Sequence, residues 1–241
     1  MLPANKDQAL HKTIMIRVLI KILDDTFLSQ NMFFKGGTCA SMLGYLDRFS
    51  VDLDFDIKSK EVNAEISKRL EVIFTTLDLE IKDYSKNVLQ YHLKYDAPVG
   101  SRNTLKIDAV DVPYKNNNYE NALLTEINRY ATCQTKETLF TNKLVTLIDR
   151  YDKHNAIAGR DLYDIHHFLK NGFDLKEDLI VERRGVDIKT YLKQLIEFIN
   201  EHVTQTVINQ DLNFLLDYKK FNAIRQTLKD ETVAMLKDRL G

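Results

Sequence analysis

The sequence lacks the features of secreted, disulfide-bonded or membrane-spanning proteins. Its 241 residues include only two cysteines, Cys39 and Cys133, with no CxxC pair, so no disulfide framework is expected. No stretch approaches about 18 uninterrupted apolar residues, the length that predicts a membrane span. The N-terminal segment MLPANKDQALHK contains no apolar core followed by a cleavage site. These absences predict a soluble cytoplasmic protein that has no membrane partner.

A strong excess of charge is also missing. The chain has 34 Lys and Arg against 35 Asp and Glu, and its formal net charge is -1. Bulk electrostatics therefore do not predict a polyanion-binding protein, and any contact with nucleic acid must come from a local basic patch. Hydrophobic residues make up 44% and charged residues 29%, which is typical of a globular protein with an ample core.

Hydrophobic spacing divides the chain into a mixed first part and a helical second part. Alternating apolar residues predict strands, and apolar residues repeating every three or four positions predict helices. Strands are expected over 50–57, 77–84, 88–95 and 104–112. Helices are expected over 5–28, 38–46, 61–76, 136–153, 159–170, 187–203 and 219–239. The asparagine-rich stretch 113–121 is typical of a linker. We therefore predict an α+β protein with a mixed-sheet domain at 1–115 and a helical domain at 116–241.

The most unusual segment is FFKGGTCASMLGYLDRFSVDLDFDI, residues 33–57. Aspartate is a poor strand former, yet Asp52, Asp54 and Asp56 would all project from one face of a strand. From the strand rise, neighbouring carboxylates on that face lie about 6–7 Å apart. Carboxylate oxygens are the preferred ligands of Mg²⁺. Asp108, in the segment LKIDAV, would supply a third carboxylate from a neighbouring strand and complete a site for two metal ions.

A glycine corner precedes these aspartates. Gly36, Gly37 and Thr38 open an expected helix, with Thr38 as its cap, and their backbone N–H groups suit a triphosphate. With the aspartates, this arrangement predicts metal-assisted phosphoryl or nucleotidyl transfer. Taken singly, a Gly-Gly pair is usually a turn and alternating aspartates are usually a solvated strand edge. Asp56 fits either an exposed position or a supporting contact of the site.

These motifs resemble the nucleotidyltransferase fold family typified by DNA polymerase β, in which a Gly-Gly or Gly-Ser turn is followed by Asp-x-Asp. More narrowly, they resemble the AbiEii/AbiGii toxin family, which includes the MenT toxins. Its Lys-Gly-Gly-Thr segment is matched by Lys35 to Thr38. Its Arg-x-Ser-x-Asp-x-Asp segment is matched by Arg48, Ser50, Asp52 and Asp54. The 15 residues from Gly37 to Asp52 exceed the common polymerase-β-like spacing, and the Arg-x-Ser segment accounts for the difference.

A second set of residues matches later motifs of the same family. The segment NKLVTLIDRYDKHNAIAGRDLYDIHHFL carries Lys143 on one expected helix, and Arg160, Asp161 and Asp164 on the next. From the residues alone, Lys143 reads as a lysine at a helix edge. The resemblance implies instead that it binds the nucleotide phosphates. It also implies that Asp161 or Asp164 orients Lys143 or the attacking hydroxyl, and the sequence leaves both open.

The resemblance implies a Mg²⁺-dependent nucleotidyltransferase with a polymerase-β-like domain, acting as the toxin of a toxin–antitoxin or phage-defence system. NTP would be the substrate, RNA, in particular tRNA, the acceptor, and an antitoxin the partner. Asp52, Asp54 and Asp108 would hold the metal. Lys35, Gly36, Gly37, Thr38, Arg48, Ser50 and Lys143 would bind the nucleotide. Two alternatives stay open, namely a small-molecule nucleotidyltransferase and a nucleotide-binding module without catalysis.

Two other features of the helical part also admit a functional interpretation. His166 and His167 have no third ligand at a zinc-like spacing, so they are expected to be ordinary helix residues. The segments VERRGVDIKTYLK and DYKKFNAIRQTLKD are basic and helical, and a solvated helix face is their ordinary interpretation. An RNA acceptor would require such a patch. In that case Arg183, Arg184, Lys219 and Lys220 are expected to line the RNA groove.

Overall fold

The computed structural model describes residues 6–85, 88–111 and 114–241, which fall into two compact units. The first, here called the sheet unit, comprises Met1–Pro113 and Asn118–Thr135. The second, the helical unit, comprises Tyr114–Asn117 and Lys136–Gly241. Each unit is described by itself. The division differs from the sequence-based boundary at residue 115, because residues 118–135 join the sheet.

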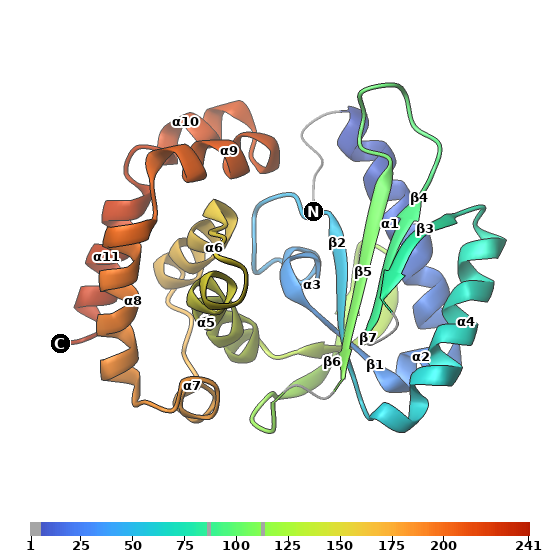
Figure 1. Ribbon diagram of the computed structural model, residues 1–241, viewed down its shortest axis with the longest axis horizontal. Coiled ribbons are helices and arrows are strands. Elements are labelled where there is room, and N and C mark those ends of the chain that lie inside the picture. The colour runs from blue at the N-terminus through green and yellow to red at the C-terminus, as the bar shows by residue number, and fades with distance from the viewer. Residues whose placement is uncertain (1–5, 86–87, 112–113) are drawn as a thin grey trace. The chain divides into compact units, whose positions relative to one another are not determined.

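Within the described residues, seven strands form one mixed sheet in the order β3–β4–β5–β2–β1–β7–β6 (Figure 1). The strands are β1 (Met32–Lys35), β2 (Asp52–Ile57), β3 (Glu80–Ser85), β4 (Leu89–Lys94), β5 (Thr104–Asp111), β6 (Tyr119–Leu124) and β7 (Arg129–Gln134). The pairs β2–β5 and β1–β7 are parallel, and the other neighbours are antiparallel. The mixed sheet confirms the predicted α+β class.

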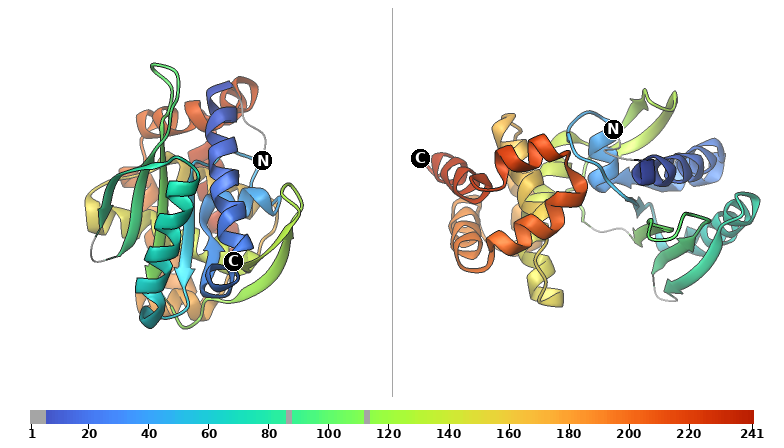
Figure 2. Two further views of the ribbon diagram at one scale, coloured as in Figure 1. Left: turned by 90° about the vertical axis from the view of Figure 1, so that its right-hand side faces the viewer. Right: turned by 90° about the horizontal axis from the view of Figure 1, so that it is seen from above.

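Helices cover both faces of this sheet. They are α1 (Lys6–Asp24), α2 (Thr26–Asn31), α3 (Gly36–Met42) and α4 (Asn63–Thr76), with a short 3₁₀ helix η1 at Lys60–Val62. Helices α1 and α4 lie side by side on one face, while α3 lies on the other (Figures 1 and 2). The single helix expected over 5–28 ends early, because Asp25 caps α2 by accepting a hydrogen bond from the N–H of Leu28 (2.9 Å). Residue 5 lies outside the described residues.

The hairpin of β6 and β7 was not predicted from the sequence. Strand β6 begins at Tyr119, inside the stretch interpreted as a linker, and four of its six residues are polar or small. Its turn contains Asn128 with φ of 51°, a left-handed conformation that asparagine tolerates. Three of the six residues of β6 are exposed and only Leu124 is buried, so the strand lacks the apolar alternation by which strands are recognised.

The helical unit is built around α6. It contains α5 (Lys136–His154), α6 (Gly159–Lys170), α7 (Glu177–Arg184), α8 (Ile188–His202), α9 (Gln205–Leu215), α10 (Tyr218–Ile224) and α11 (Leu228–Asp238). Helix α6 packs against α5, α9 and α11. Helices α7 and α9 were not predicted, and the helix expected over 219–239 is divided into α10 and α11. None of the helices in the described part of the chain is long and apolar enough to cross a membrane.

Candidate active site

The register of β2 and β5 brings the predicted carboxylates together. Strand β2 buries Leu53, Phe55 and Ile57 on one face, so the alternating aspartates lie on the other. Asp54 pairs directly with Asp108 across the parallel ladder, and paired residues of neighbouring strands project to the same side. The third carboxylate therefore lies where the sequence-based interpretation placed it.

These carboxylates repel one another. Burial and the charges of Asp52 and Asp108 outweigh the lowering effects of Lys35 and Lys106, and the pKa of Asp54 is raised to about 6. A carboxyl group with this pKa is only partly ionised close to pH 6. The face of β2 thus holds more negative charge than its surroundings balance.

Two cationic side chains lie beside the carboxylates of Asp52 and Asp108. Nη2 of Arg102 is 3.7 Å from Oδ1 of Asp52. Asp108 accepts hydrogen bonds from Nζ of Lys106 (2.7 Å) and Nε2 of Gln90 (3.1 Å). Across residues 6–85, 88–111 and 114–241, no group of three or more His, Cys, Asp or Glu side chains is arranged to hold a metal ion. The donor set nevertheless fits a divalent cation chemically, because its ligands are carboxylates whose charge is not fully balanced.

The glycine corner is explained by how closely its backbone approaches neighbouring side chains. Gly36 has φ of +77°, and a Cβ atom there would lie 2.3 Å from Oδ2 of Asp54. A Cβ atom on Gly37 would lie 2.9 Å from both Nη2 of Arg48 and Oγ of Ser50. Gly36 is therefore required by both its backbone conformation and close packing, and a side chain at Gly37 would displace Arg48 or Ser50. The corner brings the backbone directly against the Asp54 carboxylate.

Of three buried residues predicted to bind nucleotide, two make hydrogen bonds that brace β2 and the segment before it. Thr38, Arg48 and Ser50 are buried. The Thr38 hydroxyl does not cap α3 but donates to the carbonyl of Asp52 (2.5 Å). Nη1 of Arg48 donates to the Phe49 carbonyl (2.9 Å). These contacts support the site from within the sheet unit, and direct contact of the three residues with nucleotide stays a prediction.

Asp56 is not a solvated edge residue. It is fully buried and accepts hydrogen bonds from Nζ of Lys35 (2.5 Å), Oη of Tyr119 (2.8 Å) and Nε2 of Gln134 (2.7 Å). Lys35, predicted to bind nucleotide, is thereby held on the aspartate face of β2. Sequence analysis missed Tyr119 and Gln134 because both belong to the unpredicted hairpin.

In the helical unit, Lys143 lies among buried carboxylates. Its Nζ is 3.0 Å from Oδ1 of Asp161 and 3.1 Å from Oδ2 of Asp164, and both aspartates are fully buried. Nε of Arg150 also donates to Asp161 (3.0 Å). Burial alone would raise the pKa of Asp161, but Lys143 and Arg150 outweigh it and lower the pKa to about 2. Both predicted aspartates therefore hold Lys143.

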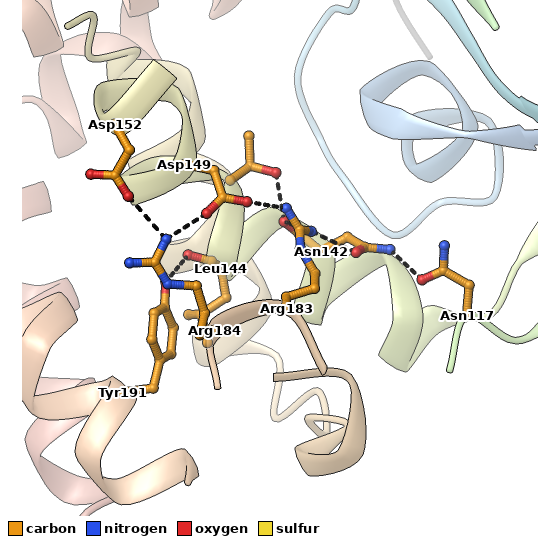
Figure 3. Close-up of polar contacts among 9 residues, drawn as sticks. Asn117, Asn142, Leu144, Asp149, Asp152, Arg183, Arg184 and Tyr191 are labelled. Atoms are coloured by element: carbon orange, nitrogen blue, oxygen red, sulfur yellow. Dashed lines mark hydrogen bonds and ion pairs between the residues drawn. The ribbon is translucent and has the colours of Figure 1, made fainter. Parts of the chain in front are cut away.

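Arg183 and Arg184, which an RNA acceptor would place along its groove, are paired with acidic side chains instead of lying on a solvated helix face. Arg183 pairs with Asp149 and donates to Oδ1 of Asn142 (2.7 Å), while Arg184 donates to Asp149 (2.6 Å) and Asp152 (3.1 Å) (Figure 3). Arg184 also lies over the ring of the buried Tyr191. The two guanidinium groups thus join α7 to α5. Lys219 and Lys220 lie on α10, where Lys219 is exposed.

One histidine of the α6 pair, His166, contacts a neighbouring helix. Nε2 of His166 lies 2.8 Å from Glu231 on α11. Burial lowers the pKa of His166 despite this contact. The imidazole therefore links two packed helices.

The comparison with family profiles decides the family. The profile described as nucleotidyl transferase AbiEii toxin, type IV TA system, matches residues 17–233. The chain belongs to this family. Like the other AbiEii proteins, it is a nucleotidyltransferase, and a type IV toxin–antitoxin system implies a nucleotide substrate and an antitoxin partner. No curated protein matches the chain.

Solved structures share the fold. JHP933 from Helicobacter pylori is 22% identical with a TM-score of 0.59, and the match covers 98% of this chain and 94% of that one. MenT4, a nucleotidyltransferase toxin from Mycobacterium tuberculosis, is 17% identical with a TM-score of 0.54, over 96% and 84%. An antigenic nucleotidyltransferase-like protein from Paracoccidioides brasiliensis is 14% identical with a TM-score of 0.52, over 91% and 99%. The fold of this AbiEii chain is thus a nucleotidyltransferase fold throughout.

Proposed function

We propose that this AbiEii protein transfers a nucleoside monophosphate from NTP to an RNA hydroxyl, with tRNA as the acceptor and Mg²⁺ as the cofactor. The observation that carries the proposal is the pairing of Asp54 with Asp108 against the Gly36 backbone. Like charges are held together here although they raise the pKa of Asp54. Such an arrangement destabilises the folded protein and is understandable where a cation is to be bound.

Asp52, Asp54 and Asp108 would hold Mg²⁺, which would offset charge on the triphosphate. The acceptor hydroxyl would attack the α-phosphorus and release its proton to solvent water, while the bond from that phosphorus to the β-phosphate oxygen breaks. Pyrophosphate would leave. Lys143, whose Nζ lies within 3.1 Å of Asp161 and Asp164, would neutralise phosphate charge, and the Lys35–Thr38 backbone would contact the triphosphate.

The RNA acceptor and a role in phage defence follow from the resemblance to the family's toxins. A small-molecule acceptor is the second candidate. One observation favours it: Arg183 and Arg184, which were expected to line an RNA groove, are paired with Asp149 and Asp152. That pairing leaves fewer cations for a phosphate backbone.

The test is a transfer assay with Mg²⁺, each labelled NTP in turn, and total RNA. Label in a tRNA-sized band supports the proposal. Absence of transfer in EDTA supports the requirement for a divalent metal ion. The matched pair of variants is Asp54→Asn and Asp83→Asn, since Asp83 is an exposed aspartate on β3. Loss of transfer in both variants, or in neither, would contradict the assignment of Asp54 to the active site. Label on small molecules of a cell extract, with none on RNA, would favour the second candidate.

A further inference from the structure

Arg102 is a cation of the acidic site that the family motifs do not include. It lies between β4 and β5, with Nη2 3.7 Å from Oδ1 of Asp52. This separation is longer than a hydrogen bond, so the two charges attract each other without a fixed geometry. About a third of the Arg102 side chain is exposed (34%). Its Nε donates to the Thr104 carbonyl (3.2 Å), which anchors the guanidinium by one nitrogen.

A buried hydrogen-bonded chain holds the backbone of Arg102. His11 of α1 is 1% exposed; its Nε2 lies 2.8 Å from the Val51 carbonyl and its Nδ1 2.7 Å from Oη of Tyr95. Oη of Tyr95 in turn lies 2.8 Å from the Arg102 carbonyl. We call His11 and Tyr95 the clasp. It connects Val51, the residue before Asp52, to Arg102.

The clasp consists of polar groups placed in the core, where they require partners. Burial lowers the pKa of His11, and Arg102 lowers it further, while Asp52 and the Val51 carbonyl raise it. A buried imidazole and phenol are costly unless their hydrogen bonds are made. The bonds that satisfy them end at the carbonyl of Val51, the residue before Asp52, and at the carbonyl of Arg102 itself. The clasp therefore fixes where Arg102 lies relative to the acidic face.

We propose that Arg102 is a phosphate-binding residue of the acidic site and that the clasp positions it. The inference rests on the proposed function and adds a ligand to it. A guanidinium group presents planar paired donors that match phosphate oxygens. Its loose contact with Asp52 can be exchanged for a phosphate once that carboxylate is engaged elsewhere. The phosphate belongs either to NTP or to the RNA backbone, and the two sources are separable by experiment.

The first experiment measures binding without transfer. NTP with Mg²⁺, and tRNA without nucleotide, are titrated separately into the wild type, Arg102→Met and Arg129→Met. Arg129 is the matched control because it also pairs with an aspartate of the sheet unit, Asp24 (2.6 Å). Loss of one phosphate contact predicts an affinity about 10- to 100-fold weaker for Arg102→Met, and no change for Arg129→Met.

Weaker NTP binding assigns Arg102 to the triphosphate, and weaker tRNA binding assigns it to the acceptor. Unchanged affinity for both ligands, or equal losses in the two variants, overturns the proposal. These outcomes are independent of catalysis. If the wild type binds NTP but labels no acceptor, the proposed function fails while the titration still decides the role of Arg102.

The second experiment tests the clasp. Tyr95→Phe removes the hydroxyl but keeps the ring, and is made alone and with Arg102→Met. Positioning predicts that Tyr95→Phe weakens phosphate binding about three- to tenfold in the wild type and has no further effect once Arg102 is absent. Equal losses in both backgrounds overturn the positioning role, and thermal unfolding of each variant shows whether the fold is retained.

Discussion

The two units each hold a group of aspartates beside basic side chains, and their electrostatics are opposite. In the sheet unit, strand alternation and parallel register align carboxylates with carboxylates, and the pKa of Asp54 rises to about 6. In the helical unit, Lys143 and Arg150 of α5 face Asp161 of α6, and its pKa falls to about 2. The first arrangement is destabilised by the repulsion between its carboxylates. The second is already neutralised and stabilises the fold.

The largest effect is expected from a substitution in the aspartate group of the sheet unit. Asp54→Asn keeps the volume of the side chain but removes the charge proposed to hold Mg²⁺. Because metal-ion catalysis supplies several kcal/mol, we expect transfer to fall at least about a thousandfold. Initial rates at saturating Mg²⁺ and NTP measure this effect. A rate within tenfold of the wild type would remove Asp54 from the site.

The second-largest effect is expected from a substitution in the aspartate group of the helical unit. Asp161→Asn leaves Lys143 beside an amide, and losing one partner of a buried ion pair costs about 3–5 kcal/mol. Urea unfolding at pH 7 measures the loss, with the exposed Glu197 of α8 as control in Glu197→Gln. The lowered pKa makes this stability present above about pH 4 and progressively lost towards pH 2. A loss below 1 kcal/mol would contradict the idea that this group stabilises the fold.

A third prediction separates a ligand from a structural cation. Lys143 and Arg150 both contact Asp161, so replacing either should destabilise the helical unit. Only Lys143 is proposed to contact phosphate, at about 1.5–3 kcal/mol. We expect Lys143→Met to raise the KM for NTP about 10- to 100-fold and Arg150→Met to leave it within threefold. Equal changes in KM would make Lys143 a structural residue.

The sequence predicted the parts of this site that depend on local pattern. The alternation of β2 and the apolar neighbours of Asp108 were enough to place both strands in one sheet. The hydrogen bonding of Asp56 was not predictable, because its partners Tyr119 and Gln134 lie on strands and are 63 and 78 residues further along the chain. Only the tertiary structure brings these donors together.

The pairing of Arg183 and Arg184 with acidic side chains was not predicted for a related reason. A run of arginines has the same composition whether it faces solvent or an acidic helix. Arg183 and Arg184 lie 34 and 35 residues from Asp149, and no local pattern links them. The glycine corner was recognised from its motif, but its cause, the approach of Gly36 to Asp54, required the register of β1 and β2.

The smallest expected effect is a pH-dependent change in the stability of the metal-free protein. The raised pKa of Asp54 means that, without metal, the folded state loses stability as the pH rises from about 4 through about 6. Asp54→Asn removes that penalty, so it should stabilise the metal-free protein at pH 8 by about 1–2 kcal/mol after allowance for solvent screening. At pH 4 the gain should nearly vanish, because the folded wild type is then protonated at Asp54. Urea unfolding in EDTA at the two pH values measures the difference, and Asp83→Asn should show no such dependence. If Asp54→Asn instead destabilises the protein at pH 8, the carboxylates of β2 do not repel one another, and the contrast between the units is lost.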